Sequence, residues 1–359
     1  MVKILLARAL HYSETKMDQV AVAGQAANLE TSVVGKSARL GDISARDIPR
    51  LLTKDEIRGL SEIDSGKFVL AALVEIGLMA AAVVISETWF NPFTYLFAII
   101  VIGTRINGLG GLMHDAAHYR AFRNRTINDI AGEIAAFPTT ASMAGYRNSH
   151  FSHHRELNSH KDPDWVRSLL LEDYEFPAPQ IIFLRRLLLH VSGIRAPGSV
   201  IGFHKNAETR DIPVLTARLR IAVLLGLVVS SIALGFWPQL LLYWAVPILT
   251  VFLGLRYFRI VAEHFAVGHD GVLSESRTVV APAWQLFWLA PWGLNYHLEH
   301  HLFPGITCFN LGKAHRILMT RTPFAEQAHI TRGYGGLLRE VASAAPGERD
   351  KARAALAGT

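Results

Sequence analysis

Cysteine and charge are both scarce in this chain of 359 residues. A single cysteine, Cys308, excludes an internal disulfide and any metal site built from several thiolates. Only 18% of the residues are charged while 50% are hydrophobic, a balance too apolar for an ordinary soluble domain of this length. We therefore expect a membrane protein whose metal or redox chemistry relies on ligands other than sulfur.

Four long apolar runs are candidates for membrane spans. They cover residues 68–85, residues 93–104 with a glycine-rich continuation to 113, residues 219–236 and residues 240–255. An α-helix rises about 1.5 Å per residue, so runs of this length can cross a hydrocarbon core of about 30 Å. Because the runs lie close together in pairs, the sequence predicts an all-α integral membrane protein with four transmembrane helices in two hairpins.

The distribution of positive charge predicts the orientation of these helices. The turns at 86–92 and 235–239 contain no Lys or Arg, whereas the segment 114–220 is rich in Arg. The positive-inside rule then places both termini and this long segment on the cytoplasmic side, with the inner (cytoplasmic) membrane as the expected location. The net charge of +6 is explained by an anionic membrane surface, and no nucleic-acid partner is expected. Three regions follow: a cytosolic N-terminal arm at 1–65, a membrane domain at 66–325 and a cytosolic tail at 326–359.

Histidine is abundant, with 16 residues, and half of them fall into three clusters, HDAAH, HFSHH and HLEHH. Histidines three or four residues apart share one face of a helix, so one helix can offer two or three imidazoles to a metal. Neutral imidazole suits Fe, Zn and Cu, and eight imidazoles exceed what one ion can hold, so two metal ions are implied. The predicted ligands are His114, His118, His150, His153, His154, His297, His300 and His301.

The three clusters are not equally specific. An HxxxH pair is expected by chance about once in a chain with this many histidines, so the first cluster alone is weak support. One chance copy of HxxHH has a probability of roughly 0.03, and two copies fall near one in a thousand. Histidines that are merely hydrogen-bonded in the core or exposed on the surface are therefore a poor explanation of the three clusters together.

A ninth ligand is expected at the end of the fourth apolar run. His264 follows Glu263 there, and His269 is its rival, with His264 preferred because it lies nearer to the run. Side chains that can accept a hydrogen bond from the N–H group of a ligand imidazole, and so orient the ring, also lie near the clusters. They are Asp115, Asp162, Asp164, Glu263, Asn295 and Glu299. Five isolated histidines are interpreted as surface or hydrogen-bonded residues: His11, His190, His204, His315 and His329. For His160 this interpretation and a role in orienting a ligand imidazole are both left open.

In this order and spacing, HDAAH, HFSHH followed by KDPD, a Glu-His pair and NYHLEHHLFPGI resemble the histidine boxes of the membrane fatty acid desaturase superfamily. This superfamily includes lipid desaturases, hydroxylases and carotenoid ketolases, and the resemblance covers roughly residues 68–321. It implies two Fe2+ ions held by the eight histidines and His264 in a cytoplasmic helical cap. It also implies an O2-dependent oxidoreductase, a fatty acyl or lipid desaturase, with no catalytic residues beyond the metal ligands and no other cofactor-binding residues.

The boxes depart from those of some members of the superfamily. Three residues separate the histidines of the first box, whereas acyl-CoA desaturases have four, which weakens an assignment to acyl-CoA. The third box begins with His297 where front-end desaturases usually have Gln, and the chain has no His-Pro-Gly-Gly segment of a fused cytochrome b5. A separate electron-transfer protein of the ferredoxin, rubredoxin or cytochrome b5 type is therefore expected.

Two alternatives remain open at this point. A hydroxylase or ketolase acting on a carotenoid, an alkane or another small amphiphile would use the same histidines, because substrate placement decides the outcome. A metal transporter would need ionisable residues within the spans, and Glu75 and Arg105 are too few to favour it. For the substrate site, the candidate channel walls are Phe151, Trp284, Phe287, Trp288, Trp292 and Tyr296, and the candidate headgroup ligands are Arg120, Arg123 and Arg147. For any single one of these aromatic residues, ordinary packing or interfacial anchoring is the better explanation, and the positive-inside bias is sufficient to explain the arginines.

Overall fold

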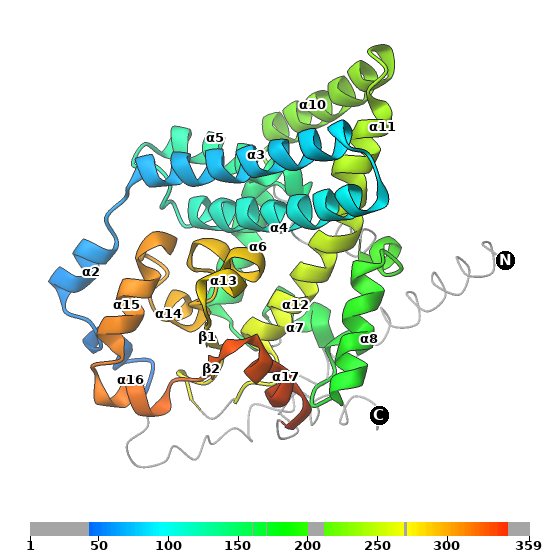
Figure 1. Cartoon of the computed structure of the whole chain (residues 1–359). Coiled ribbons are helices and arrows are strands. Elements are labelled where there is room, and N and C mark those ends of the chain that lie inside the picture. The colour runs from blue at the N-terminus through cyan, green and yellow to red at the C-terminus, as the bar shows by residue number, and fades with distance from the viewer. Residues whose placement is uncertain (1–42, 160, 170, 200–211, 269–270, 344–359) are drawn as a thin grey trace.

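The computed structural model describes residues 43–159, 161–169, 171–199, 212–268 and 271–343, and these are mostly helical (Figure 1). Four helices are long and apolar enough to cross a membrane: α3 (Ser65–Thr88), α4 (Pro92–Ala117), α10 (Val214–Ala233) and a continuous run over Trp237–His264. The run consists of α11 (Trp237–Leu240), two π-helical turns, η5 (Leu241–Ala245) and η6 (Ile248–Phe252), and α12 (Leu253–His264). The four spans match the apolar runs of the sequence, and two of them continue further than predicted, to Ala117 and His264.

Local capping explains where the first two spans begin. The side chain of Asp64 accepts the backbone N–H of Lys67 at the start of α3. After a short turn, Asn91 accepts the N–H groups of Phe93 and Thr94 and so caps α4, with proline at the first helical position. The two helices consequently run side by side in opposite directions (Figure 1).

Polar side chains lie between these two helices, while apolar side chains face outward. Glu75 on α3 and Arg105 on α4 are buried, whereas Leu70 and Leu73 are exposed as expected for a surface in contact with lipid. At Gly108 a Cβ atom would lie 2.2 Å from Oε1 of Glu75, so only glycine leaves room for this carboxylate.

The shorter elements come before, between and after the spans in the chain. The segment after α4 forms α5 (Arg125–Ala136), α6 (Met143–Arg155), α7 (Pro163–Leu169) and α8 (Gln180–Val191). After the fourth span come α13 (Ala283–Leu289), α14 (His297–Leu302), α15 (Leu311–Leu318), α16 (Thr322–Gln327) and α17 (Gly333–Ser343), while α2 (Lys54–Leu60) precedes the first span. Figure 1 shows α13 to α16 gathered below α3 and α4, on the opposite side from α10.

A small parallel sheet is the one departure from the all-α prediction within the described residues. Strand β1 (Thr278–Val280) pairs with β2 (Ile330–Arg332), with Val279 opposite Thr331. Most of these residues are β-branched and so favour extended backbone. The sheet joins the segment between α12 and α13 to the segment that leads into α17.

His11, His160, His204 and His269 lie outside the described residues.

Candidate metal centre

The C-terminal ends of two helices carry the histidines of the first two clusters. His114 lies in the last turn of α4, and His118 occupies the C-cap position of the same helix. Helix α6 carries His150, His153 and His154 in its last turns. The second membrane span and the first histidine box are therefore one continuous helix, although the sequence suggested that the box follows the span.

The remaining predicted ligands lie on α12 and α14. His264 is the last residue of α12, and the six-residue helix α14 carries His297, His300 and His301. The chain turns sharply just before α14 at Gly293, which has a φ of +79°. A Cβ atom there would lie 2.4 Å from a backbone oxygen, so this turn requires glycine.

The nine predicted imidazoles come together in two adjoining groups. Within each group, one ligand nitrogen of every ring lies within 4.8 Å of those of the others. The groups are in contact, since the ring centroids of His154 and His301, one from each group, are 4.3 Å apart. The five-histidine cluster consists of His114, His118, His150, His154 and His300, and the four-histidine cluster consists of His153, His264, His297 and His301.

Helix geometry explains how each HxxHH motif divides between the clusters. Residues four apart are offset by about 40° around an α-helix, whereas residues three apart are offset by about 60° in the other direction. The first and last histidines of HFSHH therefore share the five-histidine cluster, while the middle one, His153, reaches the other cluster. In HLEHH the first and last histidines share the four-histidine cluster, and the middle one, His300, reaches the first. Each motif thus contributes to both clusters.

Hydrogen bonds between the rings do not satisfy the five-histidine cluster. Nε2 of His150 lies 3.0 Å from Nε2 of both His118 and His154, and Nε2 of His154 also lies 2.9 Å from Nε2 of His300. A neutral imidazole nitrogen carries either one proton or one lone pair, so it cannot bond well to two neighbours. Nε2 of His114 is buried without a hydrogen-bond partner. A donor set that converges in this way fits a cation at its centre.

The four-histidine cluster has the same character. Nε2 of His297 lies 2.8 Å from Nε2 of His264 and 3.0 Å from Nε2 of His301. One nitrogen is again shared between two neighbours that compete for it. The two clusters therefore offer two separate positions for a metal ion, and the binding of metal there stays a prediction.

Burial keeps most of these rings neutral. It lowers the pKa of His118 to about 4 and the pKa of His154 to about 2. Burial and then the neighbouring histidines lower the pKa of His150, His300 and His301 well below the usual value. A neutral imidazole presents the lone pair that a metal ion requires, so the clusters are prepared for a cation at neutral pH.

Asp162 orients one of the rings. Its Oδ2 lies 2.9 Å from Nδ1 of His153 and accepts the N–H of Asn158, while its Oδ1 accepts the N–H groups of Asp164 and Trp165. Burial lowers the pKa of His153, but the hydrogen bond to Asp162 and the nearby carboxylates outweigh it and raise the pKa. With Nδ1 held as the donor to Asp162, Nε2 is the nitrogen left for the four-histidine cluster.

The other predicted acceptors bond to groups outside the rings. Glu263 accepts the Nε–H of Arg259 at 2.9 Å, and its second oxygen is 3.9 Å from Nε2 of His297. Its role near a ring is therefore electrostatic. Asp115 accepts the backbone N–H of Cys308, the Asn295 amide donates to the carbonyl of Val279, and Asp164 pairs with Arg167.

Glu299, which is buried, and the partly buried His315 form a pair that sequence reasoning missed. Nδ1 of His315 lies 2.6 Å from Oε1 of Glu299, and the Thr278 hydroxyl donates to the other oxygen. His190 and His329 are also paired with carboxylates. These three isolated histidines are therefore hydrogen-bonded, as expected, and they belong to neither cluster.

The predicted substrate residues have different roles in the structure. The Trp292 indole donates to Glu75 at 2.6 Å, and the Arg105 guanidinium lies 4.1 Å from the centroid of the Phe287 ring. Two of the candidate channel walls thus pack around a buried ion pair. Arg147, considered as a headgroup ligand, is buried, so the headgroup interpretation is wrong for this residue.

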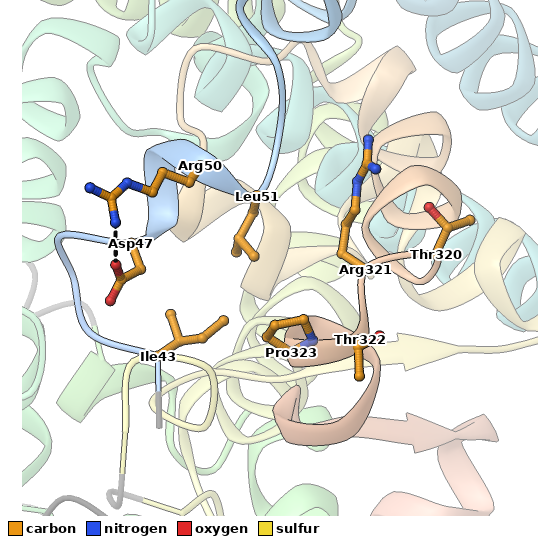
Figure 2. Close-up of a pocket in the computed structure, with 8 residues that line it drawn as sticks. All are labelled: Ile43, Asp47, Arg50, Leu51, Thr320, Arg321, Thr322 and Pro323. Atoms are coloured by element: carbon orange, nitrogen blue, oxygen red, sulfur yellow. Dashed lines mark hydrogen bonds and ion pairs between the residues drawn. The ribbon is translucent and has the colours of Figure 1, made fainter. Parts of the chain in front are cut away.

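A surface groove of about 590 Å³ lies away from the histidines (Figure 2). The segment Ile43 to Leu51 forms one wall, and the turn between α15 and α16 forms the other. Its two charged side chains on the first wall, Asp47 and Arg50, pair with each other at 3.2 Å. None of the nine imidazoles lines the groove.

Comparison with known proteins agrees with the character of the site. The model of the fatty acid desaturase family matches residues 90–333. A dihydrorhizobitoxine desaturase from Bradyrhizobium elkanii is 29% identical over 278 residues, which cover 72% of this chain and 76% of the relative. A chloroplastic omega-6 fatty acid desaturase from Glycine max is 22% identical over 77% of this chain and 67% of its own length. An sn-1 acyl-lipid omega-3 desaturase (ferredoxin) from Nostoc sp. is 26% identical over 67% and 70%, respectively.

The family match covers more than half of the chain and includes all nine clustered histidines. The four apolar helices agree with the membrane location of such enzymes. On these grounds the chain belongs to the fatty acid desaturase family.

Proposed function

We propose that this protein is an O2-dependent di-iron desaturase that introduces a carbon–carbon double bond into a fatty acyl chain or lipid. The convergence of the two histidine clusters, largely neutral and in contact with each other, is the observation that carries the proposal. Imidazoles arranged in this way have no other satisfactory partner than metal ions.

The nine imidazoles would hold one Fe2+ ion in each cluster, with His264 as the ninth ligand. A site built from several thiolates is excluded, because Cys308 is the single cysteine and belongs to neither cluster. Two iron ions bound there would supply the reduction of O2 that allows hydrogen to be removed from an unactivated C–H bond. The protein would contribute the neutral rings, their orientation through Asp162, and a buried site from which water is largely excluded.

The electron balance requires a partner protein. Reduction of O2 to two molecules of water consumes four electrons and four protons. The two C–H bonds that break as the double bond forms release two electrons and two protons. A donor must provide the other two electrons, and the solvent provides the other two protons. We propose a separate ferredoxin, rubredoxin or cytochrome b5 type protein, and the ferredoxin named for the Nostoc relative supports this class.

We infer the arrangement in the membrane from the ends of the helices. Helices α4 and α12 both end at the histidines, which suits two hairpins, α3 with α4 and α10 with the run to His264, that place the site on one side of the bilayer. With the positive-inside rule, this side, both termini and a helical cap are cytoplasmic, and the membrane is the inner one. The regions are a cytosolic arm at 1–65, the membrane domain at 66–325 and a tail at 326–359.

One comparison favours a second candidate. The relative at 29% identity is named for dihydrorhizobitoxine, which its name does not describe as a fatty acid, whereas the others are named for fatty acids or acyl lipids. Desaturation of a smaller amphiphile would use the same metal centre. Hydroxylation or ketone formation on the same scaffold is distinguished from both by the product.

Product analysis after expression in a heterologous host tests the proposal. Mass spectrometry of extracted lipids should show acyl chains that have lost two hydrogens, absent from cells with the His118→Ala variant. Addition of oxygen would identify a hydroxylase instead. Unchanged lipids together with a dehydrogenated small amphiphile would favour the second candidate.

A further inference from the structure

Two of the helices that deliver imidazoles end inside the protein. The last four carbonyl groups of an α-helix have no partner within the helix, and this end carries a partial negative charge. At α4 and α12 these ends lie against the metal centre, where water is largely excluded. Each end is closed by a buried arginine that comes from a different element.

Arg147, from α6, closes the end of α4. Its Nε donates to the carbonyl of Ala117 at 2.9 Å, and its Nη2 donates to the carbonyl of Ala116 at 3.2 Å. Asp129 on α5 balances the charge, with 2.6 Å between its Oδ1 and Nη2. The guanidinium also lies 3.9 Å from the centroid of the Tyr119 ring. The two carbonyls lie between the histidines of HDAAH, so this contact fixes the turn that aims both imidazoles.

Arg277, which precedes β1, closes the end of α12 in the same way. Its side chain is 0% exposed, and its Nε pairs with Glu340 of α17 at 3.1 Å. Burial lowers the pKa of Arg277 to about 10, so the side chain is still charged at neutral pH. Its two Nη atoms donate to four carbonyl groups around His264. The acceptors are Val261 at 3.3 Å, Ala262 at 2.9 Å, Phe265 at 3.0 Å and Ala266 at 2.6 Å.

The next residue extends this contact to α14. The hydroxyl of Thr278 donates to Glu299, which lies on α14 among the histidines of HLEHH. The backbone N–H of Arg277 donates to the carbonyl of Glu263 at 3.0 Å. One dipeptide therefore joins the helix that carries His264 to the helix that carries most of the remaining four-histidine cluster.

We propose that Arg147 and Arg277 are positioning residues, each assigned to a different metal position. Arg147 keeps the imidazoles of the five-histidine cluster in position by binding the end of α4, and Arg277 does the same for the four-histidine cluster by binding the end of α12. The inference rests on the proposed function, because it takes both clusters as metal sites. A guanidinium suits this role because its five N–H donors lie in a fixed planar fork, whereas lysine offers three donors on a flexible stem and glutamine offers two.

The test measures metal affinity at one cluster at a time. One background carries His297→Ala and His301→Ala and so keeps only the five-histidine cluster. The other carries His118→Ala and His150→Ala and keeps a working four-histidine cluster. Each purified protein is stripped of metal and titrated anaerobically with Fe2+ alone, so that the readout is a dissociation constant and does not depend on turnover.

The expected result is a crossover. Arg147→Gln should weaken binding about 10- to 100-fold in the first background and leave it unchanged in the second, and Arg277→Gln should do the reverse. Arg58→Gln, which changes an exposed arginine on α2, is the matched control and should affect neither. If either arginine substitution weakened binding at both clusters, the inference would be overturned, because a general loss of folding acts on both sites. If neither substitution weakened binding at either cluster, the inference would be overturned as well.

A second pair of variants covers the case in which a buried arginine cannot be replaced. Asp129→Asn and Glu340→Gln retain the arginines and remove only their counter-charges, and they should give the same crossover with smaller changes. The same titration separates the two proposals. If the unaltered protein binds about two ions per chain and the crossover is absent, only the positioning roles fail. If it binds none, the proposed function fails as well.

Discussion

Removal of the Glu75 carboxylate should destabilise the protein because it leaves a positive charge buried between α3 and α4. The side chains of Glu75 and Arg105 are 0% and 2% exposed, and Oε2 lies 3.3 Å from Nη1 without the alignment of a hydrogen bond. At this distance the attraction is about 5 kcal/mol for an effective dielectric constant of about 20. Desolvation of both ions offsets much of this attraction in the intact protein.

The loss in the free energy of unfolding caused by Glu75→Ala should therefore be larger than the net stabilisation that the intact ion pair provides. We expect the free energy of unfolding to fall by about 3–5 kcal/mol, because Arg105 stays behind without a counter-charge and the Trp292 indole loses its acceptor. Glu75→Gln should cost less, since the amide oxygen can still accept from Trp292. Replacement of both ionic residues, as in Glu75→Met with Arg105→Met, should cost less than Glu75→Ala.

Reversible unfolding in mixed detergent micelles, followed by circular dichroism, measures these differences. The informative comparison is the single substitution against the double one. If Glu75→Ala and the double methionine variant lost equal stability, the buried charge could not be the cause of the loss. If Glu75→Ala had no effect, water would have to reach the two charged side chains, contrary to their burial.

Three further predictions concern the histidine clusters and the stability of the fold at acid pH. His153→Ala should abolish turnover and lower the iron content, and retained turnover would contradict the ligand assignment. Asp162→Ala should keep the imidazole of His153 but weaken iron binding about 10- to 100-fold, as measured by anaerobic titration. Burial raises the pKa of Glu340, but its hydrogen bond to His329 and the charge of Arg277 lower it to about 2 from 4.5. Because the folded-state pKa is depressed, this carboxylate stabilises the fold above about pH 4.5, and the contribution is lost as the pH falls toward 2. The stability difference between the unaltered protein and Glu340→Gln should therefore shrink across that range in acid-unfolding curves, and a constant difference would refute the assignment.

Much of the fold could be predicted from hydropathy alone. Apolar runs must form helices in a bilayer because every backbone polar group has to be bonded within the segment. The four spans therefore followed from composition, but their ends did not. Helix α4 continues through Arg105 and Asn107 to Ala117, since the polar side chains on it are bonded by neighbouring elements. The short sheet of Thr278–Val280 with Ile330–Arg332 depends on a distant partner strand, and no local pattern indicates it.

For the metal centre, the sequence determined which imidazoles are available, because spacings of three and four residues place histidines on one face of a helix. The same spacing separates the middle histidine of each HxxHH motif from the outer two, but the cluster that each one joins depends on how α6 and α14 pack against their neighbours. The same limit applies to Arg147 and Arg277. In the sequence they are two of many cationic residues on the cytoplasmic side, and their distinction arises from the carbonyl groups of α4 and α12 that folding brings to them. Local spacing is encoded by the helix itself, whereas a contact between distant segments exists only once the chain has packed.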